Sequence, residues 1–488
     1  MDGYDVVVLG GGPAGCAIAA RLSEDPARTV CLVEAGPDHG PRAAGRWPAE
    51  LLDPSAIPES HDWRDEHASL PWARVIGGCS AHNACAVAHG PAADYDAWAA
   101  DGGEGWRWAT LEPCLSRARD ALRARARAPA ELGIWHAALL EAAEEAGLER
   151  LDRFDAATAG AGAMAANVVD GVRHNAAFAY LDPARERPNL TIAGATVADR
   201  VVLEGGRATG AVVHGPGGER TLHAGRVVLT AGAYGSPAIL LRSGIGPEDE
   251  LARHGIAVAH RLQGVGAALA DHCRAGLGFA LGPRAADAMR AEHGDRAIAV
   301  QAAVKWRSPL AGAAPWDVHL LAIVPPDRSQ GRITAGLLDP RSRGRVGLRS
   351  RRPADLPVVD HGFLSDREGH DLGVLEAAVE LARELGATRA LRRLTAGEID
   401  PGPQVDARAH ARANVVTYYH PTGTCRLGRP DDPAAVVGAD AAVHGVEGLH
   451  VADLSIVPRP VLAGTHLTAL AVAERVADLV HAADRPSP

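Results

Sequence analysis

The chain has 488 residues, 47% of them hydrophobic, and a formal net charge of −10 at pH 7. This length predicts about two to four domains, and the apolar content is sufficient to give each of them a core. The acidic balance argues against binding to nucleic acid or to an anionic membrane surface.

The sequence also bears on location and on redox state. No apolar stretch reaches the roughly 20 residues of a transmembrane helix, and the first apolar run begins within a few residues of Met1, so we expect a cytoplasmic protein that does not enter a membrane. Seven cysteines without a CxxC pair indicate reduced thiols, and neither a disulfide framework nor a metal site is expected.

A glycine turn near the start is the first functional signal. Residues 4–9, which are apolar apart from Asp5, have the length of a strand, and an alanine-rich helical segment follows the turn. In the turn, Gly10 permits the tight bend, Gly12 lets the backbone approach a pyrophosphate, and Gly15 lets helix and strand pack closely. The pattern predicts the first βα unit of a dinucleotide-binding fold.

An acidic residue at the expected distance strengthens this interpretation. The next predicted strand, residues 29–33, ends at Glu34. An acid about 20 residues after the glycine turn binds a ribose 2′-hydroxyl, which disfavours a 2′-phosphorylated ligand. The residues thus favour NAD or FAD over NADP.

Further along the chain, residues 36–73 lack periodicity and are expected to form an excursion over the surface or the pocket. Residues 109–150 return to helical patterning, and strands separated by glycine turns are expected from 190 to 229. Residues 274–425 predict a sheet with two helices. A strand at 449–452 and a helix at 467–479 close the chain.

Five longer motifs, all in the printed sequence, indicate a family. They are RVIGGCSAHNAC at 74–85, GAYGSPAILLRSGIG at 232–246, LQGVGAALADH at 262–272, YYHPTGTCRLG at 418–428 and VADLSIVPRPVLAGTHLTALAVAER at 451–475. Together they resemble the glucose-methanol-choline (GMC) family of FAD-dependent oxidoreductases, and within it the choline-oxidase-like members.

The resemblance implies a fold of mixed class, α/β and α+β. A Rossmann-like FAD-binding domain would be accompanied by a discontinuous substrate domain on an antiparallel sheet. The FAD-binding domain would take residues 1–150, 190–273 and 426–488, and the substrate domain residues 151–189 and 274–425.

The resemblance also implies which residues contact the cofactor. Along the isoalloxazine and the pyrophosphate we expect Gly77, Gly78, Cys79, Asn83 and Ala84. Val197 would approach the adenine, and Ala452 and Asp453 the ribityl chain. His82 occupies the position at which choline oxidases attach the flavin covalently, so the FAD is expected to be bonded to His82, whereas a histidine that only packs beside the ring is the alternative.

Two histidines carry the chemistry that the resemblance implies. His420 matches the family's general acid or base, and His466 matches a second position that is His or Asn among relatives. Imidazole can take the hydroxyl proton of an alcohol near neutral pH while hydride leaves for flavin N5. The expected reaction is oxidation of an alcohol to an aldehyde or ketone, with oxygen or another electron acceptor.

The substrate is expected to differ from choline. The segment 296–316, where choline oxidases present a glutamate, contains no acid and holds Lys305 and Arg307. Asp339 also replaces a histidine of that clade. Tyr418 and Tyr419 are instead expected to form an aromatic wall of the substrate pocket.

Other functions stay open at this point. Some family members are hydroxynitrile lyases, which keep FAD without redox turnover, and a flavin-binding protein without catalysis is a third possibility. The sequence leaves open whether the enzyme is an oxidase or a dehydrogenase and whether it forms a homodimer.

Overall fold

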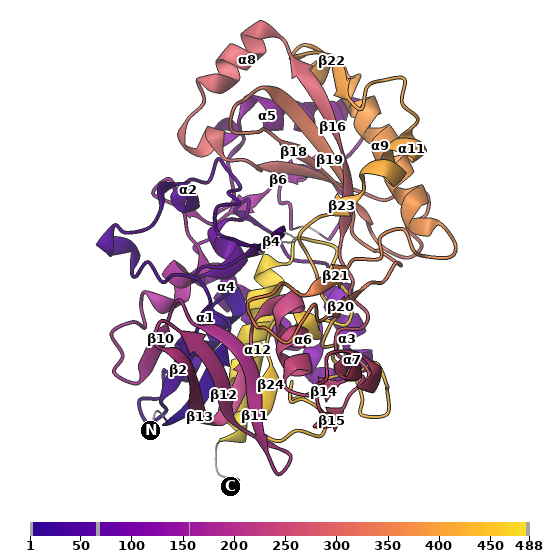
Figure 1. The fold of residues 1–488 in the computed structure, drawn as a ribbon. Coiled ribbons are helices and arrows are strands. Elements are labelled where there is room, and N and C mark those ends of the chain that lie inside the picture. Colours follow the sequence, from indigo (N-terminus) through magenta and orange to yellow (C-terminus); the bar gives the residue numbers. More distant parts are fainter. Residues whose placement is uncertain (1–2, 65–68, 156, 485–488) are drawn as a thin grey trace.

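Two seven-stranded sheets lie at opposite ends of the molecule (Figure 1). The computed structural model describes residues 3–64, 69–155 and 157–484. The first sheet lies at the end that holds both chain termini, and the second lies at the other end. Within the described part of the chain, no helix is both long and apolar enough to cross a lipid bilayer.

The first sheet combines a parallel layer with an antiparallel meander. Its strand order is β10-β2-β1-β13-β12-β11, and β24 also pairs with β13. The pairs among β10, β2, β1, β13 and β24 are parallel, whereas β11, β12 and β13 are antiparallel neighbours. The bounds are β1 Gly3–Leu9, β2 Val30–Val33, β10 Leu190–Ala193, β11 Val197–Glu204, β12 Arg207–Gly215, β13 Gly218–Leu229 and β24 Leu449–Val451.

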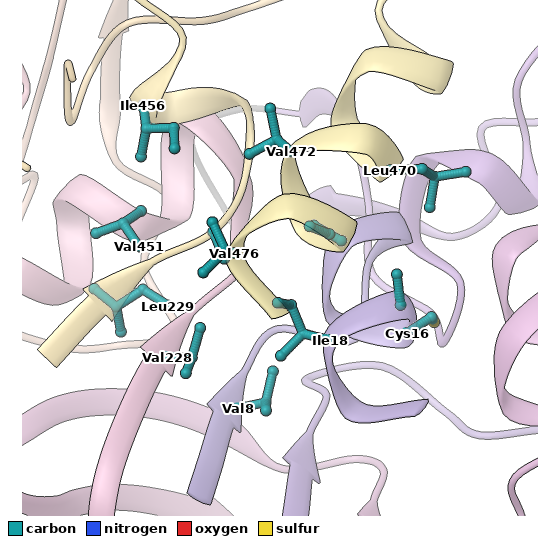
Figure 2. Close-up of a cluster of buried hydrophobic side chains, with 14 of the residues drawn as sticks. Val8, Cys16, Ile18, Val228, Leu229, Val451, Ile456, Leu470, Val472 and Val476 are labelled. Atoms are coloured by element: carbon teal, nitrogen blue, oxygen red, sulfur yellow. The ribbon is translucent and has the colours of Figure 1, made fainter. Parts of the chain in front are cut away.

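Helices from both ends of the sequence cover the parallel layer. In Figure 2, Ile18 of α1 (Pro13–Leu22) and Val476 of α12 (His466–Ala483) lie beside Val8 of β1 and Val228 of β13. All four side chains are buried. The C-terminal helix therefore completes a core that begins in the first βαβ unit, and the strand and helix expected near the C-terminus are confirmed as β24 and α12.

The second sheet is antiparallel throughout, as the resemblance implied. Its order is β22-β16-β19-β18-β17-β6, with β23 beside β16. One face packs against α5 (Ile134–Glu145) and α9 (His370–Gly386) in a separate apolar core. The bounds are β6 Gly160–Ala163, β16 Cys273–Leu281, β17 Ala302–Trp306, β18 Val318–Ile323, β19 Gln330–Leu337, β22 Thr395–Asp400 and β23 Val416–Thr417.

Shorter elements connect the sheets. Between residues 274 and 425 there are four α-helices where the sequence predicted two. The clearest expected helix is α9, whereas α8, α10 and α11 have eight residues or fewer, which is shorter than the window in which a helical period is recognised. The remaining helices are α2 Ala49–Leu52, α3 Ala92–Gly102, α4 Trp108–Ala121, α6 Gly232–Arg242, α7 Glu248–Arg253, α8 Pro283–Arg290, α10 Arg389–Arg392 and α11 Ala407–Asn414. The two-stranded pairs are β3 Asp62–Arg64 with β4 Ser69–Ala73, β5 Ala86–Val87 with β7 Ala165–Ala166, β8 Val168–Val169 with β9 Val172–Arg173, β14 Ile245–Gly246 with β15 His260–Arg261, and β20 Arg345–Gly347 with β21 Val358–Asp360.

Candidate active site

One continuous cavity of about 550 Å³ connects the glycine turn of the first sheet with the second sheet. Its lining includes Gly10 and Glu34 of the first βαβ unit as well as His420 and His466. Of the residues singled out from the sequence, Gly10, Gly12, Glu34, Gly78, His82, Asn83, Ala84, Val197, Asp453, Tyr418, Tyr419, His420 and His466 line it. The lining does not include Gly15, Gly77 or Ala452.

The glycine turn has no room for larger residues. A Cβ atom at Gly15 would lie 1.8 Å from the carbonyl oxygen of Gly10, and one at Gly10 would lie 2.7 Å from the Thr230 backbone. A Cβ at Gly12 would have only one atom within 4 Å, the Thr230 carbonyl oxygen at 4.0 Å, so this glycine leaves the cavity side open. Gly15 therefore acts through helix-strand packing behind the cavity, while Gly10 and Gly12 form its wall.

Glu34 is held at the end of β2 by two backbone amides. Gly11 N–H donates to its Oε2 at 2.8 Å, and Gly36 N–H donates to its Oε1 at 2.7 Å. Burial raises the pKa of this carboxyl to about 7, although both amides favour the charged form. The carboxylate is thus oriented at the cavity end nearest the glycine turn.

A second glycine turn brings the segment 74–85 against the first. Gly77 N–H donates to the Gly11 carbonyl at 2.7 Å. Gly77 and Gly78 both have positive φ angles, and a Cβ at Gly78 would lie 2.6 Å from the Gly12 Cα. These contacts bring two turns, far apart in sequence, to one side of the cavity.

His82 follows this turn and is nearly buried. Its Nδ1 lies 3.8 Å from Oδ1 of Asp62, and its Nε2 has no hydrogen-bond partner. Burial lowers the pKa of His82 to about 4, whereas burial and the nearby Glu59 raise the pKa of Asp62 to about 6. The ring is therefore neutral at pH 7, with a nucleophilic nitrogen available at the cavity wall.

Asp453 closes the turn that precedes α6. Its Oδ2 accepts from Gly232 N–H at 2.8 Å and from the Ser236 hydroxyl at 2.6 Å, and its Oδ1 accepts from Ser455 N–H at 2.8 Å. Ala452, its neighbour, bonds to the Leu229 carbonyl and lies behind the lining. Asp453 thus ties the end of β24 to the start of α6.

The backbone before His420 is fixed by a buried carboxylate. Asp271 accepts a hydrogen bond from His420 N–H at 2.9 Å and another from the Thr417 hydroxyl at 2.5 Å. Tyr419, between them, has a φ of 68°, and its N–H donates to Thr417 Oγ1 at 2.8 Å. A left-handed tyrosine is uncommon, and such strain tends to concentrate at functional sites.

The Nδ1 atoms of His420 and His272 lie 2.8 Å apart, so one ring donates to the other. Burial lowers the pKa of His272 to about 3, so this ring is neutral at pH 7, and its Nε2 has no hydrogen-bond partner among the described residues. In the arrangement with the His272 proton on Nε2, His272 Nδ1 is the acceptor and His420 Nδ1–H is the donor. His420 then has a lone pair on its own Nε2.

His466, the first residue of α12, has the opposite tautomer. Cys85 N–H donates to Asn83 Oδ1 at 3.0 Å, which orients the amide so that Asn83 Nδ2 faces His466 Nδ1 at 3.3 Å. Because the amide donates to Nδ1, a neutral His466 carries its proton on the buried Nε2. Burial lowers the pKa of His466 to about 4 and that of His420 well below its usual range, so both rings are neutral at pH 7.

One face of the second sheet forms the far wall. By register, Arg274, Thr334 and His319 project to the same side, away from the apolar core, together with Leu321, Ile323 and Arg332. The Tyr418 ring packs on Gly336, where an added Cβ would lie 2.9 Å from it. The wall therefore offers aromatic and aliphatic surface next to His420.

The two basic residues noted in the segment 296–316 lie outside the lining. The Lys305 amine lies 4.2 Å from the centre of the Trp316 ring and 5.2 Å from that of Phe154. Arg307 is exposed and donates to the carbonyls of Gly312 and Ala314. Neither residue lines the cavity.

Sequence reasoning missed several residues of this site. His272 and Asp271 belong to a motif quoted above, but their contact with His420 exists only in the tertiary structure. His319 is buried in the wall with a pKa lowered to about 3 by burial, and Trp72 stacks on Trp63 with ring centres 4.9 Å apart. No local pattern in the sequence distinguishes these side chains from ordinary core residues.

Comparison with known proteins gives consistent matches along the chain. The family models for GMC oxidoreductases match residues 4–274 and 340–473. Choline oxidase of Arthrobacter globiformis is 35% identical, covering 98% of this chain and 94% of its own, and human mitochondrial choline dehydrogenase is 32% identical, covering 98% and 90%. The crystal structure of pyridoxine 4-oxidase from Mesorbium loti matches with a TM-score of 0.86 and 30% identity, covering 98% of this chain and 99% of that one.

Proposed function

Since the chain belongs to the GMC oxidoreductase family and is an FAD-dependent alcohol oxidoreductase, we propose that it oxidises an alcohol to an aldehyde or ketone with His420 as the base. The observation that carries the proposal is the pair of neutral histidines at the cavity, each held by a hydrogen bond to its Nδ1. His466 presents an N–H, and we propose that His420 donates from Nδ1 to His272 and so presents a lone pair on Nε2.

The residues that line the cavity fit FAD. Gly10 and Gly12 allow the backbone to approach a pyrophosphate, and Glu34 is oriented for an adenosine ribose. Val197 lies at the adenosine end, while Gly78, Asn83 and Ala84 line the stretch that leads to the histidines. Behind the lining, Gly15, Gly77 and Ala452 shape the turns. When bound, FAD supplies the hydride acceptor.

The two histidines divide the work on the substrate hydroxyl. The Nε2 lone pair of His420 takes the hydroxyl proton, and the Nε2–H of His466 donates a hydrogen bond to the same oxygen as negative charge develops on it. The proton that His420 gains stays on its Nε2, and the hydrogen bond from its Nδ1–H to His272 Nδ1 stabilises the positive charge that the ring acquires. Asp271 holds the His420 backbone in place during this step.

His82 is proposed as the point of covalent attachment. Its Nε2 has no hydrogen-bond partner, and burial keeps the ring neutral, which is the form in which this nitrogen would hold a carbon of the flavin covalently. The C–H bond replaced by the new C–N bond would release a proton and leave two electrons on the flavin, which the electron acceptor would then remove. Asp62, 3.8 Å from Nδ1, would then stabilise the positive charge that alkylation creates on the ring. The flavin in this proposal is bonded to His82.

Choline is a poor fit for this cavity. Burying an ammonium group without an opposing carboxylate costs several kcal/mol, which a cation–π contact of about 2 kcal/mol does not offset. The carboxylates that line the cavity are Glu34, Glu59, Asp62, Asp355 and Asp453, and none of them is bonded to His420 or His466. We therefore propose a substrate without a quaternary ammonium group.

Anaerobic mixing with a panel of alcohols tests the proposal. Benzylic and other hydroxymethyl compounds should bleach the flavin absorbance at about 450 nm, and choline should do so far more slowly. A hydroxynitrile lyase would leave the flavin oxidised throughout, so a panel without any reduction would contradict the redox function. If choline reduces the flavin faster than the other alcohols, the substrate proposal is wrong, but the redox function still holds.

A further inference from the structure

We propose that Arg274 binds a carboxylate on the substrate, so that the enzyme prefers alcohols bearing an anionic group. This inference rests on the proposed alcohol oxidation and adds the substrate class. Arg274 projects from β16 into the cavity on the strand that pairs with β23, the segment leading to His420. Its guanidinium is therefore close to the reacting end of the cavity.

One edge of the guanidinium is already used by neutral groups. Its Nε donates to the Thr417 carbonyl at 3.1 Å, and its Nη2 donates to the Tyr419 hydroxyl at 3.1 Å. The cation also lies over the Tyr419 ring, with its central carbon 5.3 Å from the ring centre. These three contacts fix the side chain in one orientation without neutralising its charge.

The other edge of the guanidinium is available. Among the described residues, no acceptor bonds to Nη1 of Arg274, and no carboxylate forms an ion pair with this side chain. Burial raises the pKa of Asp271 to about 7, and the Arg274 charge opposes this shift only weakly. The two oxygens of Asp271 accept hydrogen bonds from the Thr417 hydroxyl and from His420 N–H. A half-buried guanidinium with unused N–H donors at a cavity wall is suited to bind an anionic group of a ligand.

The shape of this edge suits a carboxylate. The Nη1 and Nη2 atoms present two parallel N–H groups that match the two oxygens of a planar carboxylate. The adjoining wall is apolar, with Tyr418, Leu321 and Ile323. An added Cβ at Gly276 of β16 would have no atom closer than 3.6 Å, so this position leaves space above the sheet. An aromatic or aliphatic body between the hydroxymethyl group and the anion would fill that space.

A pair of isosteric alcohols tests the inference. We compare 4-(hydroxymethyl)benzoate with 4-(hydroxymethyl)benzamide in the FAD-loaded wild type, in Arg274→Gln and in Arg307→Gln. Arg307 has the same charge but is exposed outside the cavity lining, so Arg307→Gln is the matched control. We expect the benzoate to exceed the benzamide in kcat/KM by about 10- to 100-fold in the wild type. This ratio should fall to near one in Arg274→Gln alone.

A binding measurement separates this inference from the proposed function. The unreactive analogues 4-methylbenzoate and 4-methylbenzamide are titrated against the flavin absorbance of the same proteins, which requires no turnover. Tighter binding of the carboxylate that is lost in Arg274→Gln supports the anion site even if no alcohol reduces the flavin. Equal binding of the two analogues to the wild type overturns the inference. A parallel loss of both analogues in Arg274→Gln also overturns it, because Arg274 would then only support the turn at Tyr419.

Discussion

Replacing His272 with leucine removes the ring nitrogen that lies 2.8 Å from His420 Nδ1. The His420 N–H would then be a buried donor without an acceptor, which costs about 1–3 kcal/mol. If the whole cost falls on the transition state, in which His420 becomes charged, flavin reduction slows by about 5- to 150-fold. The variant His272→Asn places an amide oxygen near the lost nitrogen and should recover most of the rate.

The measurement is anaerobic stopped-flow reduction of the bound flavin at saturating alcohol, with the FAD content of each variant as a control for folding. The pH profile is a second readout. A hydrogen bond from the charged ring raises its pKa, so the loss of the acceptor in His272→Leu should move the acidic limb of the rate to lower pH. A His272→Leu enzyme with the rate and the pH profile of the wild type would refute the tautomer assignment.

Three further predictions follow from the site. The wild type should keep its flavin fluorescence in a denaturing gel while His82→Ala loses it, and release of all flavin from the wild type by acid would exclude the covalent bond. Burial lowers the pKa of His420, so the ring should stay neutral down to at least about pH 6.5. The rate of flavin reduction should therefore be constant above that pH and decline only in more acidic solution. A decline of the rate that already begins above about pH 6.5 would indicate that another group is the base. Gly15→Ala should lower the melting temperature and the FAD content, because the added Cβ reduces the free energy of unfolding by about 1–3 kcal/mol or more. Gly217→Ala is the control: no atom lies within 4 Å of its added Cβ. It should change the free energy of unfolding by less than about 0.5 kcal/mol.

The parts of this fold that follow from local patterns could be predicted from the sequence. Residues 6–9 of β1 and 30–33 of β2 are continuous apolar runs, as expected for a buried parallel layer. The glycine turn between these strands requires residues without a Cβ. The strand β24 and the helix α12 near the C-terminus could also be predicted from the sequence. By contrast, the short helices α8, α10 and α11 give too few turns for a period to be recognised.

The chemistry of the site depends on contacts that no local pattern reveals. The bond between His272 and His420 joins residues 148 positions apart. The sequence drew attention to Lys305 and Arg307 as basic residues for the pocket, whereas the strand register places Arg274 at the cavity instead. Side-chain direction in a sheet alternates with every residue, so only the register decides which cation faces the substrate.

The central claim is that His420 removes the substrate proton. Its most direct test is the single-turnover rate of flavin reduction in His420→Ala, compared with the wild type at the same FAD content and with His466→Asn as a milder variant. Loss of a positioned base predicts a rate about 10²- to 10⁴-fold lower in His420→Ala, with a smaller loss in His466→Asn because an amide can still donate to the alcohol oxygen. A His420→Ala enzyme that binds FAD and reduces it at the wild-type rate would contradict the account.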